Sequence, residues 1–140
     1  MLLTNQQILQ LSEAILHLDG QHLTQVFEGK AVAIFRSYKL APAARWLLAR
    51  AQGKLQAAIA DFNRAKDALI NHHSSGTGAL SAVNPNFKQF SEDFERLKQQ
   101  PVELDIDHIT LDHLHLEANE KAGSEMPIAV LNALSPLIKS

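Results

Sequence analysis

The chain has 140 residues, of which 46% are hydrophobic and 20% charged, and its formal net charge is −2. This composition is ordinary for one soluble globular domain that spans residues 1–140. Cysteine is absent, which excludes disulfides and thiolate zinc sites and suits a reducing cytoplasm. No apolar run reaches the ~18 residues of a membrane span, and the N-terminus lacks the pattern of a secretory signal.

The first predicted element is a helix over residues 4–19. Thr4 is a suitable N-cap, and Gln7 three residues later completes a capping box. Apolar side chains then recur at helical spacing from Ile8 to Leu18, and Gly20 supplies a C-terminal stop. Residues 22–40 follow as an extended segment, because β-favouring residues flank a plausible hairpin turn at 28–30.

A long helix is predicted over residues 42–72, with Pro42 in its first turn. Large side chains recur every seven residues, and alanines recur every seven in the gaps between them. The large positions are Leu48, Leu55, Phe62 and Leu69, and the alanine positions are Ala51, Ala58 and Ala65. All of them lie on one stripe of a helix, and the alanines let a second helix come close.

The same helix carries a second, outer stripe that does not belong to this seam. It consists of Trp46, Arg50, Gly53, Ala57 and Ala60. One interpretation is that the first helix or the 22–40 segment covers the stripe. The other is an interface with another molecule, in which Gly53 permits a close approach.

The segment 73–84 has the composition of a flexible linker. A helix over 85–99 follows, and its Phe87, Phe90, Phe94 and Leu97 form one apolar stripe. The linker is long enough to reverse the chain, so this helix is expected to pack antiparallel against the long one. From residue 102 apolar and polar side chains alternate, which predicts a strand or extended arm over 102–116. A polar loop over 117–125 and a short helix over 127–134 are predicted to follow.

The pattern from Asp112 to His115 is the best candidate for chemistry. Alternate residues on a strand share a face, so His113 and His115 could bind a divalent metal with Asp112 or Asp107. The alternative is the solvent face of a half-buried strand whose other face holds leucines. We adopt the alternative, because no helical metal motif accompanies the cluster, and we predict no metal, no cofactor and no catalytic residue.

Charge is distributed unevenly along the chain. Residues 28–66 contain eight of the thirteen Lys and Arg residues, whereas residues 101–140 contain seven acidic residues and two lysines. Basic side chains near aromatic ones could contact nucleic acid: Arg36, Lys39, Arg45, Arg50 and Lys54. The near-neutral net charge argues against strong nucleic-acid binding.

The order of these parts resembles small uncharacterised proteins encoded by tailed bacteriophages and prophages. The similarity rests on YKL at 38–40, FNRAKDALI at 62–70, NFKQF at 86–90, PVELDI at 101–106 and PIAVLNALSPLI at 127–138. It implies a phage context, in the cytoplasm of a bacterial host or associated with the virion. It carries over no functional residue.

We therefore predict an α+β fold that is mainly α, with a long antiparallel helical hairpin, a small β-sheet and short flanking helices. The expected function is a non-enzymatic protein–protein interaction module, a self-associating phage accessory or structural protein. One alternative is a phage-encoded inhibitor that binds a host defence or nucleic-acid-processing protein. Another is a nucleic-acid-binding accessory protein that uses the basic 30–66 region.

Overall fold

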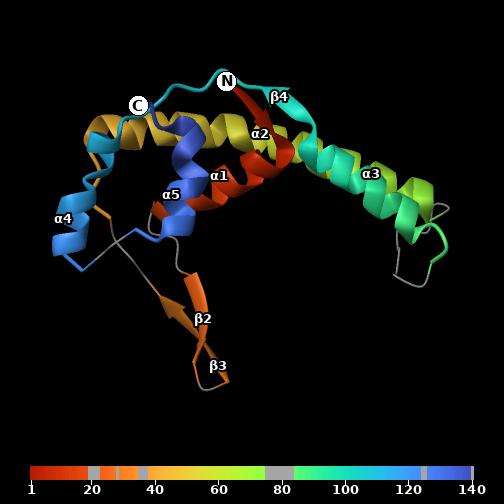
Figure 1. Ribbon diagram of the computed structural model, residues 1–140, viewed down its shortest axis with the longest axis horizontal. Coiled ribbons are helices and arrows are strands. Elements are labelled where there is room, and N and C mark those ends of the chain that lie inside the picture. Colours follow the sequence, from red (N-terminus) through yellow and green to blue (C-terminus); the bar gives the residue numbers. More distant parts are fainter. Residues whose placement is uncertain (19–22, 28, 35–37, 75–83, 124–125, 140) are drawn as a thin grey trace.

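The computed structural model describes residues 1–18, 23–27, 29–34, 38–74, 84–123 and 126–139 (Figure 1). The fold is α+β and mainly α, as predicted. Its main elements are a long helix, a shorter helix that crosses it, a second helix that runs back along it, and two small antiparallel sheets. Within the described part of the chain, no helix is long and apolar enough to span a membrane.

Helix α1 (Asn5–Leu18) begins with the predicted capping box. The Gln7 backbone N–H donates to Thr4 Oγ1 at 3.2 Å, and the Thr4 N–H donates to Gln7 Oε1 at 2.9 Å. The predicted apolar face of the helix is buried, from Ile8 to Leu18. The Asn5 side chain also donates to the Leu97 carbonyl at 2.8 Å, which ties the start of α1 to the end of the chain's third helix.

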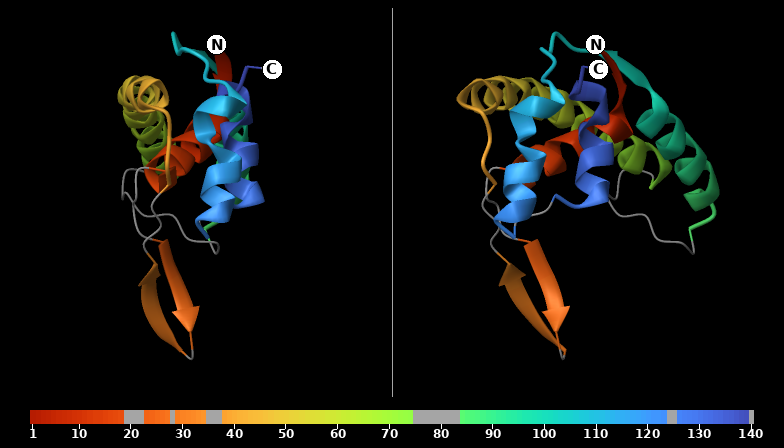
Figure 2. Two further views of the ribbon diagram at one scale, coloured as in Figure 1. Left: turned by 90° about the vertical axis from the view of Figure 1, so that its left-hand side faces the viewer. Right: turned by 60° about the vertical axis from the view of Figure 1, so that its left-hand side comes forward.

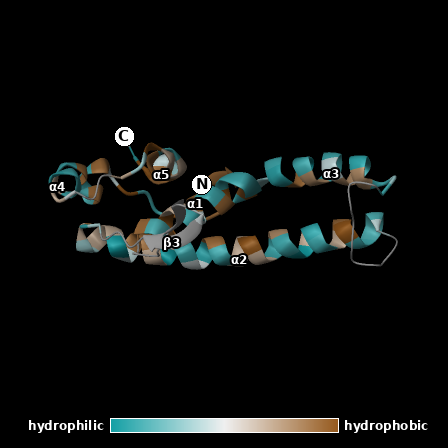
Figure 3. Ribbon diagram, turned by 90° about the horizontal axis from the view of Figure 1, so that it is seen from below, coloured by the Kyte–Doolittle hydropathy of each residue, from teal (hydrophilic) through white to brown (hydrophobic). Residues whose placement is uncertain are grey.

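Helix α2 (Pro42–His73) confirms the prediction of a long helix. Its seam is buried over most of its length, at Leu48, Ala51, Leu55, Ala58 and Phe62. Farther along, Ala65 and Leu69 are only half-buried. Figure 3 shows that the other helices lie on one side of α2 and leave its outer face uncovered.

Helix α3 (Phe87–Gln99) runs back along the C-terminal half of α2, so the predicted helical hairpin is present (Figures 1 and 3). The rings of Phe62 and Phe94 meet at a centroid distance of 5.9 Å. No residue of α3 is fully buried, because α3 contacts α2 on one side and carries charged residues on the other. Of the linker predicted over 73–84, residues 75–83 lie outside the described residues.

The two sheets each contain two antiparallel strands. Strand β2 (Leu23–Phe27) pairs with β3 (Lys30–Ile34), which confirms the hairpin predicted within 22–40. Gly29 in its turn has a φ of 78°, a conformation that favours glycine. Figures 1 and 2 show this hairpin projecting away from the helices. Strand β1 (Leu2–Thr4) pairs with β4 (Pro101–Glu103), far away in the sequence.

The prediction of a strand or arm over 102–116 holds as far as residue 110 and is wrong beyond it. Strand β4 ends at Glu103, and the chain continues as an irregular arm in which burial alternates as far as Asp107. The chain then forms a 3-10 helix, η1 (Leu111–Leu114), because the Thr110 hydroxyl and the His113 ring form a reciprocal capping box. A strand cannot continue through the left-handed backbone of His115, whose φ is 49°.

The polar loop predicted over 117–125 is also wrong in its first half, because helix α4 (Leu116–Lys121) occupies it. Helix α5 (Ile128–Leu134) agrees with the short helix predicted over 127–134, and the 3-10 helix η2 (Ser135–Leu137) follows at Pro136. Leu114, Leu134 and Leu137 are completely buried and join Leu11 of α1 and Leu55 of α2 in one core. This core fixes α1 against the inner side of α2.

Candidate interaction surface

The outer stripe of α2 lies entirely on the surface. All five of its residues are exposed: Trp46, Arg50, Gly53, Ala57 and Ala60. Trp46 is 65% exposed, which is unusual for the largest apolar side chain in the chain. A Cβ atom added to Gly53 would meet no atom within 4 Å. The first interpretation of the stripe, that the first helix or the 22–40 segment covers it, therefore does not hold among the described residues.

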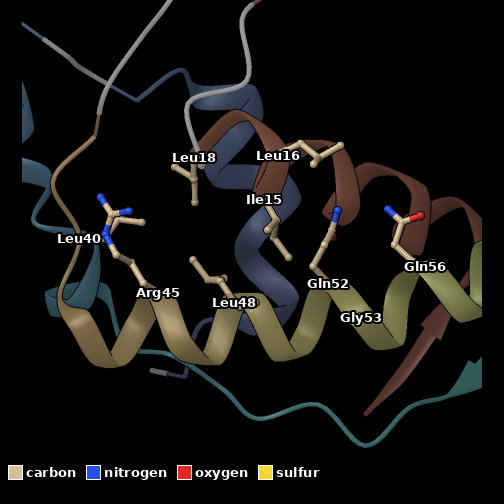
Figure 4. A pocket seen from close by; sticks show the side chains of 10 residues that line it. Ile15, Leu16, Leu18, Leu40, Arg45, Leu48, Gln52, Gly53 and Gln56 are labelled. Carbon is tan, nitrogen blue, oxygen red and sulfur yellow. The ribbon is translucent and has the colours of Figure 1, made fainter.

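Helix α1 lies beside the stripe and forms a groove with α2 (Figure 4). The groove has a volume of about 330 Å³, and its walls are mostly aliphatic. Its apolar lining comes from Ile15, Leu16, Leu18, Leu40 and Leu48. Gly53 lines the groove and also belongs to the outer stripe, so the two surfaces are continuous.

The polar residues of this groove are held by local hydrogen bonds. The Arg45 guanidinium donates to the Tyr38 carbonyl at 3.2 Å. The side-chain amides of Gln52 and Gln56 both donate to the Ser12 hydroxyl, at 3.1 and 3.2 Å. The polar side chains at the groove are thus engaged with one another or with the backbone, and its exposed lining is mainly aliphatic.

The opposite flank of the stripe pairs with the acidic segment that follows β4. The Arg50 guanidinium lies 3.6 Å from the Asp107 carboxylate, and the Lys54 ammonium lies 3.6 Å from the Asp105 carboxylate. The Lys54 ammonium also donates to the Asp105 carbonyl. These exposed pairs contribute little to stability. They do show that the basic and acidic parts of the chain meet within one molecule.

This pairing bears directly on the residues predicted to contact nucleic acid. Arg50 and Lys54 each have an acidic neighbour, and Arg45 lies at the groove, where it binds a backbone carbonyl. Lys39 is exposed, and Arg36 lies outside the described residues. Phosphate groups would have to compete with Asp105 and Asp107, which weakens the case for this surface as a nucleic-acid interface.

The weak metal candidates do not share the strand face on which they were considered. Asp112 and His113 lie in η1, and the His113 Nδ1 accepts the Thr110 backbone N–H at 3.3 Å. His115 is exposed and has a left-handed backbone, so the chain changes direction there and the alternation of a strand does not apply. The described residues contain no group of three or more metal-ligating side chains with the geometry to hold an ion.

Sequence reasoning missed a buried polar side chain, Asn119 of α4, which is 1% exposed. Its amide nitrogen donates to the carbonyls of Lys39 and Leu114, both at 2.9 Å. Its amide oxygen accepts the Lys39 backbone N–H at 2.7 Å. One asparagine thereby joins α4, η1 and the segment that leads into α2. The local sequence does not indicate that Asn119 is buried, since an asparagine in a polar run ordinarily faces water.

A second missed contact joins the distal ends of α2 and α3. The His73 Nε2 lies 2.9 Å from the Asp93 carboxylate, and the His73 ring is mostly buried against Phe90. The hydrogen bond from His73, aided by Gln89 and the charge of Arg96, holds the pKa of Asp93 below its ordinary value. The pairing of His73 with Asp93 could not be predicted from local sequence, because the two residues meet only after the chain reverses between α2 and α3.

This contact gives a prediction for the pH dependence of stability. Because the pKa of Asp93 is lower in the folded state than in the unfolded state, its carboxylate stabilises the fold above the unfolded pKa. That contribution is lost as the pH falls through the lowered folded value. Asp93→Asn should therefore reduce the melting temperature near neutral pH, and the difference from wild type should shrink in strong acid.

Thermal melts by circular dichroism from neutral to strongly acidic pH would test this. The exposed Glu92 on the same helix provides the matched control, Glu92→Gln. A difference between wild type and Asp93→Asn that stays constant with pH would contradict the proposed role of the Asp93 carboxylate.

The chain matches no family model, and its comparison with curated proteins and with solved structures gives no match. The resemblance to small phage and prophage proteins therefore stays a prediction. Function has to be argued from the surfaces described above.

Proposed function

We propose that this protein is a non-enzymatic protein–protein interaction module that associates with copies of itself through the outer stripe of α2. One observation carries the proposal, which is that Trp46 is 65% exposed next to an exposed run of small residues. Tryptophan and arginine are enriched among the residues that contribute most to binding, and contiguous exposed apolar surface marks interfaces. The commonest closed assembly is a two-fold dimer.

The phage context belongs to the same proposal and is supported by the sequence resemblance. In that setting the module acts as an accessory or structural protein in the bacterial host or the virion. The internal pairing of Arg50 and Lys54 with Asp107 and Asp105 favours a protein partner over nucleic acid. A largely apolar groove beside the stripe favours the same class of partner.

Gly53→Arg tests the proposal at the centre of the stripe. The change places a long cation in the interface, and it should weaken self-association by roughly tenfold or more. The fold should survive, because a Cβ atom at this position meets open space. Replacing a helical glycine also improves helix propensity by up to ~1 kcal/mol, so instability would not explain a loss of association.

The matched control is Asn63→Arg, which adds the same charge to an exposed position of α2 away from the stripe. Sedimentation equilibrium of the full chain would compare the two variants, and circular dichroism would check their helix content. If both variants associate as strongly as wild type, the outer stripe is not the interface.

A further inference from the structure

The groove between α1 and α2 has a cation at one end and an aliphatic surface along its length. Figure 4 shows Arg45 beside Leu40 at this end, and the aliphatic side chains of Ile15, Leu18 and Leu48 lie between the two helices. A ligand that fills the groove would therefore meet a positive charge first and apolar walls beyond it.

Arg45 differs from the other arginines that the structure describes. Arg50, Arg64 and Arg96 each lie beside a carboxylate. Arg45 has no carboxylate partner among the described residues, and its guanidinium donates to the Tyr38 carbonyl at 3.2 Å. A guanidinium has five N–H donors in a fork that matches a carboxylate. The remaining donors of Arg45 are therefore complementary to an anionic group at the end of the groove.

The dimensions of the groove fit a small, elongated ligand. Its volume of about 330 Å³ is at the lower end of the range for small-molecule sites. From Arg45 to Gln56 it follows α2 for about 16 Å, at 1.5 Å per residue. This length is comparable with that of an extended medium-chain acyl group. Such a chain would also cover Leu16, which is 38% exposed on the α1 wall.

We infer that the groove binds a free medium-chain fatty carboxylate, with its carboxylate on Arg45 and its acyl chain along Ile15, Leu16 and Leu48. Apolar walls suit a protein segment and an acyl chain alike, and hydrogen bonding decides between them. An extended peptide would bury N–H and C=O groups beside two helices whose own backbone groups are already bonded. An acyl chain has no such groups.

This inference does not rest on the proposed self-association, because Arg45 and the aliphatic residues of the groove lie outside the outer stripe. Isothermal titration calorimetry of the full chain would test it with sodium decanoate, below the concentration at which decanoate forms micelles. We expect one saturable site. The uncharged analogue 1-decanol should bind roughly tenfold more weakly or worse, and octanoate about 5- to 15-fold more weakly, because it buries two fewer methylenes.

Two variants separate the roles of the charge and the walls. Arg45→Gln should weaken decanoate binding by roughly tenfold or more and leave the binding of 1-decanol nearly unchanged. Leu16→Gln should weaken the binding of both ligands. The matched control is Arg64→Gln, which removes an exposed arginine of the same helix away from the groove and should bind decanoate like wild type. Circular dichroism would verify that each variant keeps its helix content.

Three results would overturn the inference. The first is the absence of saturable decanoate binding to the folded wild type. The second is an equal affinity for decanoate in wild type and Arg45→Gln, or an equal affinity of wild type for decanoate and 1-decanol, since Arg45 would then select no anion. The third is tighter binding of a trileucine peptide than of decanoate, which would assign the groove to a protein segment.

Discussion

Replacing Phe62 with alanine is expected to lower the free energy of unfolding by about 3–5 kcal/mol. Phe62 is 6% exposed and lies on the α2 seam where α3 packs against it. Its ring meets that of Phe94 at a centroid distance of 5.9 Å. Truncation removes the apolar contact and leaves a cavity between two helices that have few other buried contacts. Thermal and urea unfolding followed by circular dichroism would measure the loss.

Phe87→Ala is the matched control, because Phe87 is only half-buried at the distal end of α3. The same truncation there should have a clearly smaller effect. An unchanged melting temperature in Phe62→Ala would mean that Phe62 is not in the core. The antiparallel packing of α3 on α2 would then be wrong.

Asn119→Ala is expected to destabilise the fold by about 2–4 kcal/mol. The side chain is 1% exposed and makes three hydrogen bonds to the backbone of Lys39 and Leu114. Alanine cannot replace any of them, so three backbone groups would lose their partner, one in a buried setting and two in a partly buried one. Such groups are expensive to leave unpaired.

Asn63→Ala provides the comparison for Asn119→Ala, because it removes an asparagine side chain from an exposed helical position. It should be neutral or slightly stabilising, since alanine is the better helix former. Urea unfolding of both variants would measure the difference. A loss below about 1 kcal/mol for Asn119→Ala would show that this network does not hold α4 in place.

Helices α1, α2, α3 and α5 were predictable from the sequence because their signals are local. The heptad spacing from Leu48 to Phe62 and the capping box at Thr4 both act within one helix, and the structure confirms both. Strand β1 could not be predicted, because it has three residues and depends on a partner about a hundred positions away. The segment 111–116 was predicted wrongly because its leucines suggest that the preceding strand or arm continues. The structure differs because a capping box at Thr110 starts a 3-10 helix and His115 has a left-handed backbone.

The candidate surface was only partly predictable. The residues of the outer stripe could be grouped from helical spacing, but their exposure depends on which flank α1 takes. The basic side chains of 36–54 suggested one nucleic-acid face, yet Arg50 and Lys54 lie beside a segment some fifty residues farther along. The role of Asn119 depends on three separate segments. Such contacts follow from the tertiary fold.

The mass of the wild-type protein in solution tests self-association most directly. Light scattering behind a sizing column at tens of micromolar should give about twice 15.5 kDa. This follows if the exposed stripe around Trp46 and Gly53 is covered by a second copy. A single species near 15.5 kDa would contradict the proposal.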